Sequence, residues 1–141
     1  MALPEPVPGL VICYSYLWHD ERRRGVDEGR KDRPCAIVVA RVDEAGDTSV
    51  LVVPITHTEP PADRHPVALP RTLKRRLGMD DRPSWIVTDE LNQFIWPGFD
   101  LRPVSRQSPD VFHFGTLPAK LFKSVTRSIL ANAARLRNVQ R

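Results

Sequence analysis

The sequence predicts a mainly β protein, a small β-barrel that carries one long C-terminal helix. Two neighbouring runs, Cys35–Val42 and Ser49–Ile55, are rich in the apolar and β-branched residues that suit a pleated backbone. The chain has 14 prolines in 141 residues, which favours short strands and tight loops over a helical bundle. Only Pro118–Arg137 shows a sustained helical period. This length suits one domain, residues 1–141, in which residues 1–8 form a proline-rich extended arm.

The two strong β runs should form a hairpin. They flank Asp43–Asp47, whose glycine and aspartates suit a turn. An antiparallel hairpin brings the start of one strand beside the end of the other, so Arg33 and Thr56 should be neighbours. A guanidinium beside a hydroxyl can bind phosphate oxygens. Both strands are apolar on both faces, which predicts cover from a helix or a second subunit.

The segments around this hairpin have weaker patterns. Leu10–Leu17 predicts a first strand, and the charged stretch His19–Lys31, with two glycines and no hydrophobic period, predicts a flexible loop. After the hairpin, His57–Arg64 should be a loop and His65–Leu69 a short strand. Arg71–Gly78 has the length of two helical turns and a glycine stop.

The C-terminal half should add further strands and the long helix. Ser84–Asp89 predicts a strand, Glu90–Gly98 a loop with exposed aromatics, and Leu101–Val104 and Val111–Phe114 two short strands. In the final helix, Pro118 suits the first helical position, and two arginines suit the C-terminal end of the helix dipole, Arg135 and Arg137. The apolar stripe of this helix comprises Phe122, Val125, Ile129, Ala133 and Leu136.

Charge and cysteine content limit the classes of function. A formal net charge of +4 and a pI near 9.5 suit an anionic partner, either nucleic acid or an acidic protein segment, although many soluble proteins are basic. Cys13 and Cys35 fall in predicted strands without metal-ligand spacing, so we expect small buried side chains, no metal and no cofactor. The N-terminus lacks the pattern of a signal peptide or membrane span, which predicts a cytoplasmic protein.

Taken in order, several segments resemble the MazF/PemK (Kid-like) toxins of type II toxin–antitoxin systems. They are PGLVICYSYL, RKDRPCAIVVA, LVVPITH, SWIVTDELNQ and FHFGTLPAKLFKSVTRSIL, and the likeness spans about Pro8 to Ala134. The resemblance implies an SH3-like barrel that forms a homodimer. It also implies a sequence-specific, metal-independent endoribonuclease that cleaves single-stranded mRNA. In this family the RNA 2′-hydroxyl is the nucleophile, and an acidic antitoxin protein controls the enzyme.

The resemblance also assigns catalytic residues. The family's arginine before proline corresponds to Arg33, its strand-end threonine to Thr56, an acid of some members to Asp89, and a loop histidine to His19. His57 follows Thr56 and is a second candidate for proton transfer. The general base is left open. Simpler roles exist for each: a salt bridge for the arginine, a turn for the hydroxyl, and surface positions for the histidines.

Cations at the hairpin mouth and in two further basic segments, together with two aromatics, are the predicted RNA contacts. They are Arg30, Lys31, Arg22, Arg23, Arg24, Arg71, Lys74, Arg75, Phe94 and Trp96. Charge runs are more often solvated surface, and the two aromatics could equally contact a protein partner. Two rival functions remain: a catalytically inactive barrel that binds RNA or protein, and a CcdB-like toxin that acts on topoisomerase.

Overall fold

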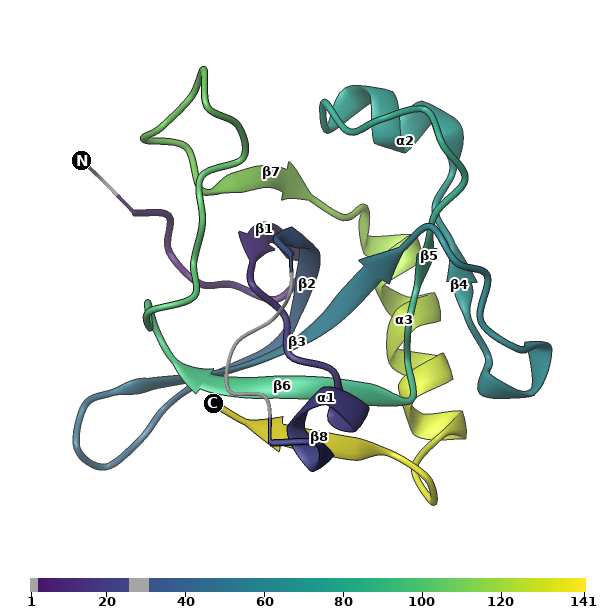
Figure 1. Ribbon diagram of the computed structural model, residues 1–141, viewed down its shortest axis with the longest axis horizontal. Helices are drawn as coiled ribbons and strands as arrows, with labels where there is room; N and C mark the ends of the chain where they lie inside the picture. Colours follow the sequence, from purple (N-terminus) through teal and green to yellow (C-terminus); the bar gives the residue numbers. More distant parts are fainter. Residues whose placement is uncertain (1–2, 26–30) are drawn as a thin grey trace.

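The protein is mainly antiparallel β, and its sheet curls on itself (Figure 1). The computed structural model describes residues 3–25 and 31–141, and within these ranges eight strands form one sheet. The strand bounds are β1 Leu10–Tyr14, β2 Arg33–Val42, β3 Thr48–Thr56, β4 Val67–Ala68, β5 Trp85–Ile86, β6 Glu90–Ile95, β7 His113–Thr116 and β8 Arg137–Gln140. The helices are α1 His19–Arg23, α2 Arg71–Arg76, α3 Ala119–Ala131 and a 3-10 turn at Ala62–Arg64. A small, curled β fold is therefore confirmed.

The predicted central hairpin is confirmed as β2 and β3. The two strands pair antiparallel from Val42↔Thr48 to Cys35↔Pro54. Its turn is closed by the Asp43 carboxylate, which accepts hydrogen bonds from the backbone N–H of Ala45 and Asp47, each at 2.9 Å. β1 lies beside β2 and pairs with it and with β7, so β2 is a central strand.

The prediction of a flexible loop over His19–Lys31 is wrong for its first part, where α1 forms. A carboxylate stabilises its start, since Glu21 accepts a hydrogen bond from the backbone N–H of Trp18 at 3.1 Å. The sequence offers no hydrophobic period here because the helix has fewer than two turns. Residues 26–30, which include the predicted RNA contact Arg30, lie outside the described residues.

The predicted loop Glu90–Gly98 is also wrong, because β6 occupies most of it. β6 pairs antiparallel with β3 and in parallel with β8. The alternation of apolar and polar residues that marks a strand is interrupted at Asn92, which is polar but fully buried. The Asn92 side chain accepts a hydrogen bond from the backbone N–H of Leu17 at 2.9 Å and donates one to the Leu17 carbonyl at 2.7 Å. Phe94 is consequently 5% exposed and stacks on Tyr14, with ring centroids 4.7 Å apart.

The C-terminal helix is shorter than predicted. α3 ends at Ala131, with Pro118 as its N-cap rather than its first residue. The next side chain, Asn132, is buried and donates to the carbonyl of Arg64 at 2.8 Å and the hydroxyl of Thr88 at 3.0 Å. A turn then leads the chain into β8, so the predicted placement of Arg135 and Arg137 at the helix end is wrong.

The remaining strand predictions hold in part. β4 lies within the predicted strand, and α2 ends before Gly78, which has a φ of +71°. β5 is limited to Trp85–Ile86, and β7 begins two residues later than predicted. The strand predicted at Leu101–Val104 is wrong: it contributes only a single bridge, between Leu101 and Tyr14.

Two hydrophobic clusters cover the two faces of the central strands. One lies toward α2 and α3 and includes Val11, Val53 and Val125; the other includes Ile12 and Tyr14. Both predicted buried cysteines lie in the interior, and burial raises the pKa of the Cys13 thiol to about 11. Because side chains of this same chain cover both faces, a homodimer is a prediction that depends on the family resemblance.

The helices of the described residues include none with the length and apolar character needed to cross a membrane.

Candidate functional site

Arg33 and Thr56 meet at the mouth of the central hairpin. Arg33 is the first residue of β2, and Thr56 is the last of β3. The register between these strands is given to Cys35↔Pro54, and two further steps bring Arg33 opposite Thr56. Both side chains line one cavity of about 570 Å³, here called the Arg33 cavity. The structure thus brings together the two residues that the sequence paired.

The Arg33 guanidinium is held by an aromatic ring. It lies 4.9 Å from the ring centroid of Trp18, a cation–π distance. Among the described residues it has no ion-pair partner, and its buried Nε has no hydrogen-bond partner. Asp89 pairs instead with Arg64 at 2.8 Å, and Asp32 lies 3.8 Å from Arg102. The alternative of a salt bridge to either aspartate is therefore not observed, and neither carboxylate occupies the Arg33 guanidinium.

Four cations and two carboxylates surround the Arg33 cavity. Arg33 lies on its wall with Lys31, Arg64 and Arg82, and the acids are Asp89 and Glu90. Asp89 is paired with Arg64, which leaves three cations, Lys31, Arg33 and Arg82, against the one carboxylate of Glu90. The lining of the cavity is therefore positively charged. Such a surface suits a phosphate group.

Thr56 occupies both roles considered for it. Its Oγ1 accepts a hydrogen bond from the backbone N–H of Thr58 at 3.1 Å, which is the turn role. A hydroxyl that accepts one bond retains its own proton for donation. The side chain can therefore stabilise the turn and donate to a ligand in the cavity.

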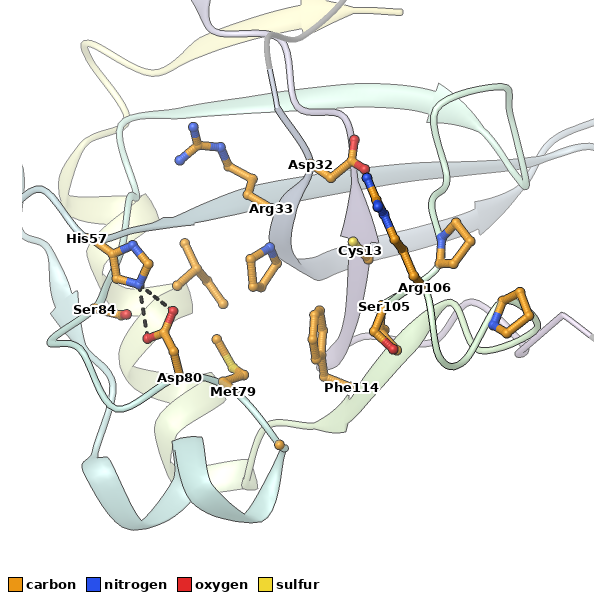
Figure 2. A pocket seen from close by; sticks show the side chains of 16 residues that line it. Cys13, Asp32, Arg33, His57, Met79, Asp80, Ser84, Ser105, Arg106 and Phe114 are labelled. Carbon is orange, nitrogen blue, oxygen red and sulfur yellow. Dashed lines mark hydrogen bonds and ion pairs between the residues drawn. The ribbon is translucent and has the colours of Figure 1, made fainter.

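His57 follows Thr56 in the chain, lines the same cavity and is oriented by Asp80. Its Nε2 is 2.9 Å from one carboxylate oxygen of Asp80 and 3.1 Å from the other (Figure 2). Burial alone would raise the pKa of Asp80, but hydrogen bonds from Lys74 and His57 lower it to about 2. A carboxylate at Nε2 favours the proton on that nitrogen and leaves Nδ1 of a neutral ring as the acceptor.

Glu90, the residue after Asp89, is a further functional candidate that the sequence did not single out. Its Oε1 accepts hydrogen bonds from the Tyr16 hydroxyl at 3.1 Å and the His19 backbone N–H at 3.0 Å. Burial raises the pKa of Glu90 above its usual value, and the side chain lines the Arg33 cavity. A raised pKa favours the protonated carboxyl, the form that can donate a proton. Only its adjacency to Asp89 pointed to it in the sequence.

His19 does not bring its imidazole to this cavity. Its Nδ1 lies 3.5 Å from Arg137 Nη1 and 3.9 Å from Asp20. The residue contributes its backbone N–H to Glu90 instead. The imidazole of His19, the histidine suggested by the family likeness, therefore lies outside the Arg33 cavity, whereas His57 lines this cavity.

The predicted RNA contacts divide into two groups. Lys31 and Arg24 line a second cavity, of about 450 Å³, which shares Trp18, Lys31, Arg33 and Glu90 with the Arg33 cavity. Arg22 and Arg23 are exposed on α1, and Arg71 and Arg75 are exposed on α2, but none of these four lines either cavity. Phe94 is buried in the core, which makes its predicted role wrong, and Trp96 is half-buried against it with ring centroids 6.2 Å apart.

Lys74 corrects another of these predictions. The side chain is 3% exposed and pairs with Asp80 at 2.9 Å and with the Ser84 hydroxyl at 2.7 Å. It also donates to the carbonyl of Arg82. The charge run RTLKRR is helical, and the helical period places Lys74 on the same face as buried Leu77, three residues later. Lys74 is therefore a structural cation.

A third cavity, of about 590 Å³, lies between the α2–β5 loop and the segment before β7 (Figure 2). We call it the Phe114 pocket. Arg33 and His57 also line the Phe114 pocket, so the pocket and the Arg33 cavity have two lining residues in common. Arg33 accordingly borders all three cavities.

Comparison with protein-family models gives no match, and comparison with curated proteins gives no relative. Within residues 3–25 and 31–141, no three His, Cys, Asp or Glu side chains are grouped as a metal site requires. The MazF/PemK resemblance thus depends on the order of the motifs in the chain.

Proposed function

We propose that the protein is a MazF/PemK-like endoribonuclease with an SH3-like barrel, which cleaves single-stranded RNA at the Arg33 cavity. The observation that carries the proposal is Arg33 itself, a guanidinium without an ion-pair partner among the described residues, on the wall of three cavities. A partially buried cation is suited to the scissile phosphate.

Arg33 stabilises the transition state by charge and geometry. During attack by the 2′-hydroxyl, negative charge grows on the phosphate oxygens that do not bridge to sugar. The planar guanidinium carries a permanent positive charge and donates hydrogen bonds to these oxygens. The Thr56 hydroxyl adds one neutral hydrogen bond to the same group.

Two groups move protons in the proposed reaction. The bond from the 2′-oxygen to phosphorus forms while the bond to the 5′-oxygen breaks. His57, oriented by Asp80, accepts the 2′-hydroxyl proton at Nδ1. Glu90, with its raised pKa, donates a proton to the departing 5′-oxygen. The products are a cyclic phosphate and a free 5′-hydroxyl, and the scheme uses no metal.

The same cationic mouth is the proposed binding surface of an acidic antitoxin. Lys31 and Arg24 are exposed beside Arg33 and would attract an acidic segment. Phe94 no longer belongs to this surface, since it packs in the core. A homodimer and a cytoplasmic location are part of the same family-based proposal.

The test is incubation of purified protein with a long RNA of mixed sequence, followed by mapping of the new ends. We expect cyclic phosphate and 5′-hydroxyl ends at a restricted set of sequences, with the same rate in the presence of EDTA. Binding without cleavage would instead identify an inactive RNA-binding barrel. A stable topoisomerase complex without RNA cleavage would identify a CcdB-like toxin.

A further inference from the structure

The Phe114 pocket shares Arg33, His57 and Asp80 with the proposed reaction, but the rest of its lining has no part in the chemistry proposed above. Its apolar lining residues include Ile55, Met79 and Phe114, of which Met79 and Phe114 are labelled in Figure 2. At about 590 Å³ it falls within the range of cavities that hold small organic groups. It opens next to Arg33, and this position suggests what it holds.

Polar groups occupy the rim of the pocket opposite the His57–Asp80 pair. Asp32, Ser105 and Arg106 line the pocket and are exposed to solvent. A carboxylate accepts hydrogen bonds from amino groups, a hydroxyl donates or accepts, and a guanidinium donates. An apolar lining with a mixed donor and acceptor rim matches a flat heteroaromatic ring with polar edges.

The walls of the pocket are fixed by the fold. The α2–β5 loop is held by Lys74, which bonds both Asp80 and Ser84. Beside Phe114, Gly115 has a φ of +134°, and a Cβ there would lie 2.7 Å from the Leu77 side chain. This close approach packs the Phe114 segment against the end of α2, so the pocket exists before any ligand binds.

We propose that the Phe114 pocket binds the base of a nucleotide adjacent to the scissile phosphate, with the base stacked on Phe114. This inference rests on the proposed endoribonuclease function, and it assigns part of the sequence preference to one pocket. Single-stranded RNA is recognised by unstacked bases that pack on aromatic side chains and are read at their edges. Because Arg33 and His57 line both cavities, a phosphate at Arg33 places an adjoining base at the pocket mouth.

The experiment measures binding of short RNAs whose 2′-hydroxyls are methylated, so that no cleavage can occur. Each RNA carries one abasic position, and the set moves this position along the strand. The proteins are wild type, Phe114→Leu, and Phe99→Leu as the matched control, because Phe99 is 97% exposed and lies outside the pocket. Leucine keeps apolar volume in the half-buried Phe114 site, and thermal unfolding of each variant checks its fold.

We expect Phe114→Leu to bind the intact RNA roughly fivefold to tenfold more weakly, the size of one lost stacking contact. One RNA of the set, the one whose abasic position removes the base that stacks on Phe114, should bind wild type and Phe114→Leu with equal affinity. Phe99→Leu should bind every RNA of the set with the same affinity as wild type. If no abasic position removes the effect, or if Phe114→Leu binds like wild type, the proposal is overturned. A pocket that holds an apolar side chain of a protein partner would give this second result.

These outcomes separate the subsite from the catalytic proposal. Wild-type protein that cleaves RNA but shows no coupling between Phe114 and any base keeps its proposed function and loses the subsite. Protein that shows the coupling but never cleaves keeps the subsite as a base-binding pocket and loses the catalytic function. Absence of RNA binding at all would overturn both.

Discussion

Two cations about a third of the chain apart, Arg33 and Lys74, show opposite uses of positive charge. Lys74 is buried and donates hydrogen bonds to a carboxylate, a hydroxyl and a carbonyl, so all of its ammonium donors have partners within the fold. Arg33 has an aromatic ring against it and, among the described residues, no carboxylate. In sequence both looked like contacts for an anion. The comparison teaches that the partners of a cation, rather than its charge, indicate whether it is available to a ligand.

The difference follows from local sequence. Asp80 comes six residues after Lys74, and the glycine stop at Gly78 turns the chain so that this carboxylate meets the ammonium. Arg33 begins a strand directly after Asp32, and successive side chains of an extended chain point in opposite directions. Asp32 therefore faces Arg102 while Arg33 faces Trp18.

The largest expected effect is on catalysis by Arg33→Lys. Lysine keeps the charge but loses the planar fork, so single-turnover cleavage of RNA should slow by roughly 10²–10³-fold, which is ~2.7–4 kcal/mol. Circular dichroism should be unchanged, because the guanidinium supports no ion pair among the described residues. Undiminished cleavage by the folded variant would exclude Arg33 from the chemistry.

Lys74→Met should act mainly on stability. It removes hydrogen bonds to Asp80 and Ser84 from a nearly buried position, and we expect the free energy of unfolding to fall by roughly 1–3 kcal/mol. Chemical denaturation measures this loss. Arg75→Gln, an exposed change on the same helix, is the control and should alter stability by less than about 0.5 kcal/mol. Equal stabilities of the two variants would contradict the structural role of Lys74.

Thr56→Val tests the weaker partner of Arg33. Valine keeps the shape of the strand end and removes one neutral hydrogen bond, worth about 1 kcal/mol. Single-turnover cleavage should therefore slow about fivefold, far less than for Arg33→Lys. A loss as large as that of the arginine variant would mean that the hydroxyl has a role in proton transfer.

The smallest expected effect is the pH dependence of stability from Asp80. Its pKa in the folded protein, about 2, is lower than the ordinary value of 3.8. The carboxylate form is thus favoured by folding, so its contribution is present above about pH 4 and is lost as the pH falls toward 2. Urea denaturation across this range should show a shallower decline for Asp80→Asn than for wild type. Solvent screens this half-exposed group, so a steep difference is not expected.

Much of the fold could be predicted because its strongest signals are local. The β2–β3 hairpin, the short helix α2 and the buried cysteines follow from β-branched runs, a turn and a glycine stop. β6 and β8 could not be predicted, because the pattern of each region depends on an asparagine that is buried although it is polar. Asn92 in β6 and Asn132 before β8 donate hydrogen bonds to backbone carbonyls that are distant in the sequence. Nothing in the neighbouring sequence indicates such partners.

The candidate site shows the same division. Hairpin geometry alone brought Arg33 to Thr56 and to the adjacent His57. The contact of Trp18 with Arg33 and the raised pKa of Glu90 depend on how separate strands pack. The burial of Lys74 depends on which face of α2 meets the core. These features required the three-dimensional structure.

The most direct test of this account is one assay of wild type, Arg33→Lys and Lys74→Met, in which single-turnover RNA cleavage and free energy of unfolding are measured on the same preparations. We predict that Arg33→Lys loses most of its cleavage rate and keeps wild-type stability. Lys74→Met should lose stability and retain more of its rate than Arg33→Lys. Two variants that lose rate and stability in parallel, or wild-type protein that leaves RNA intact, would contradict the claim that Arg33, which has no ion-pair partner among the described residues, is the phosphate-binding cation of a ribonuclease site.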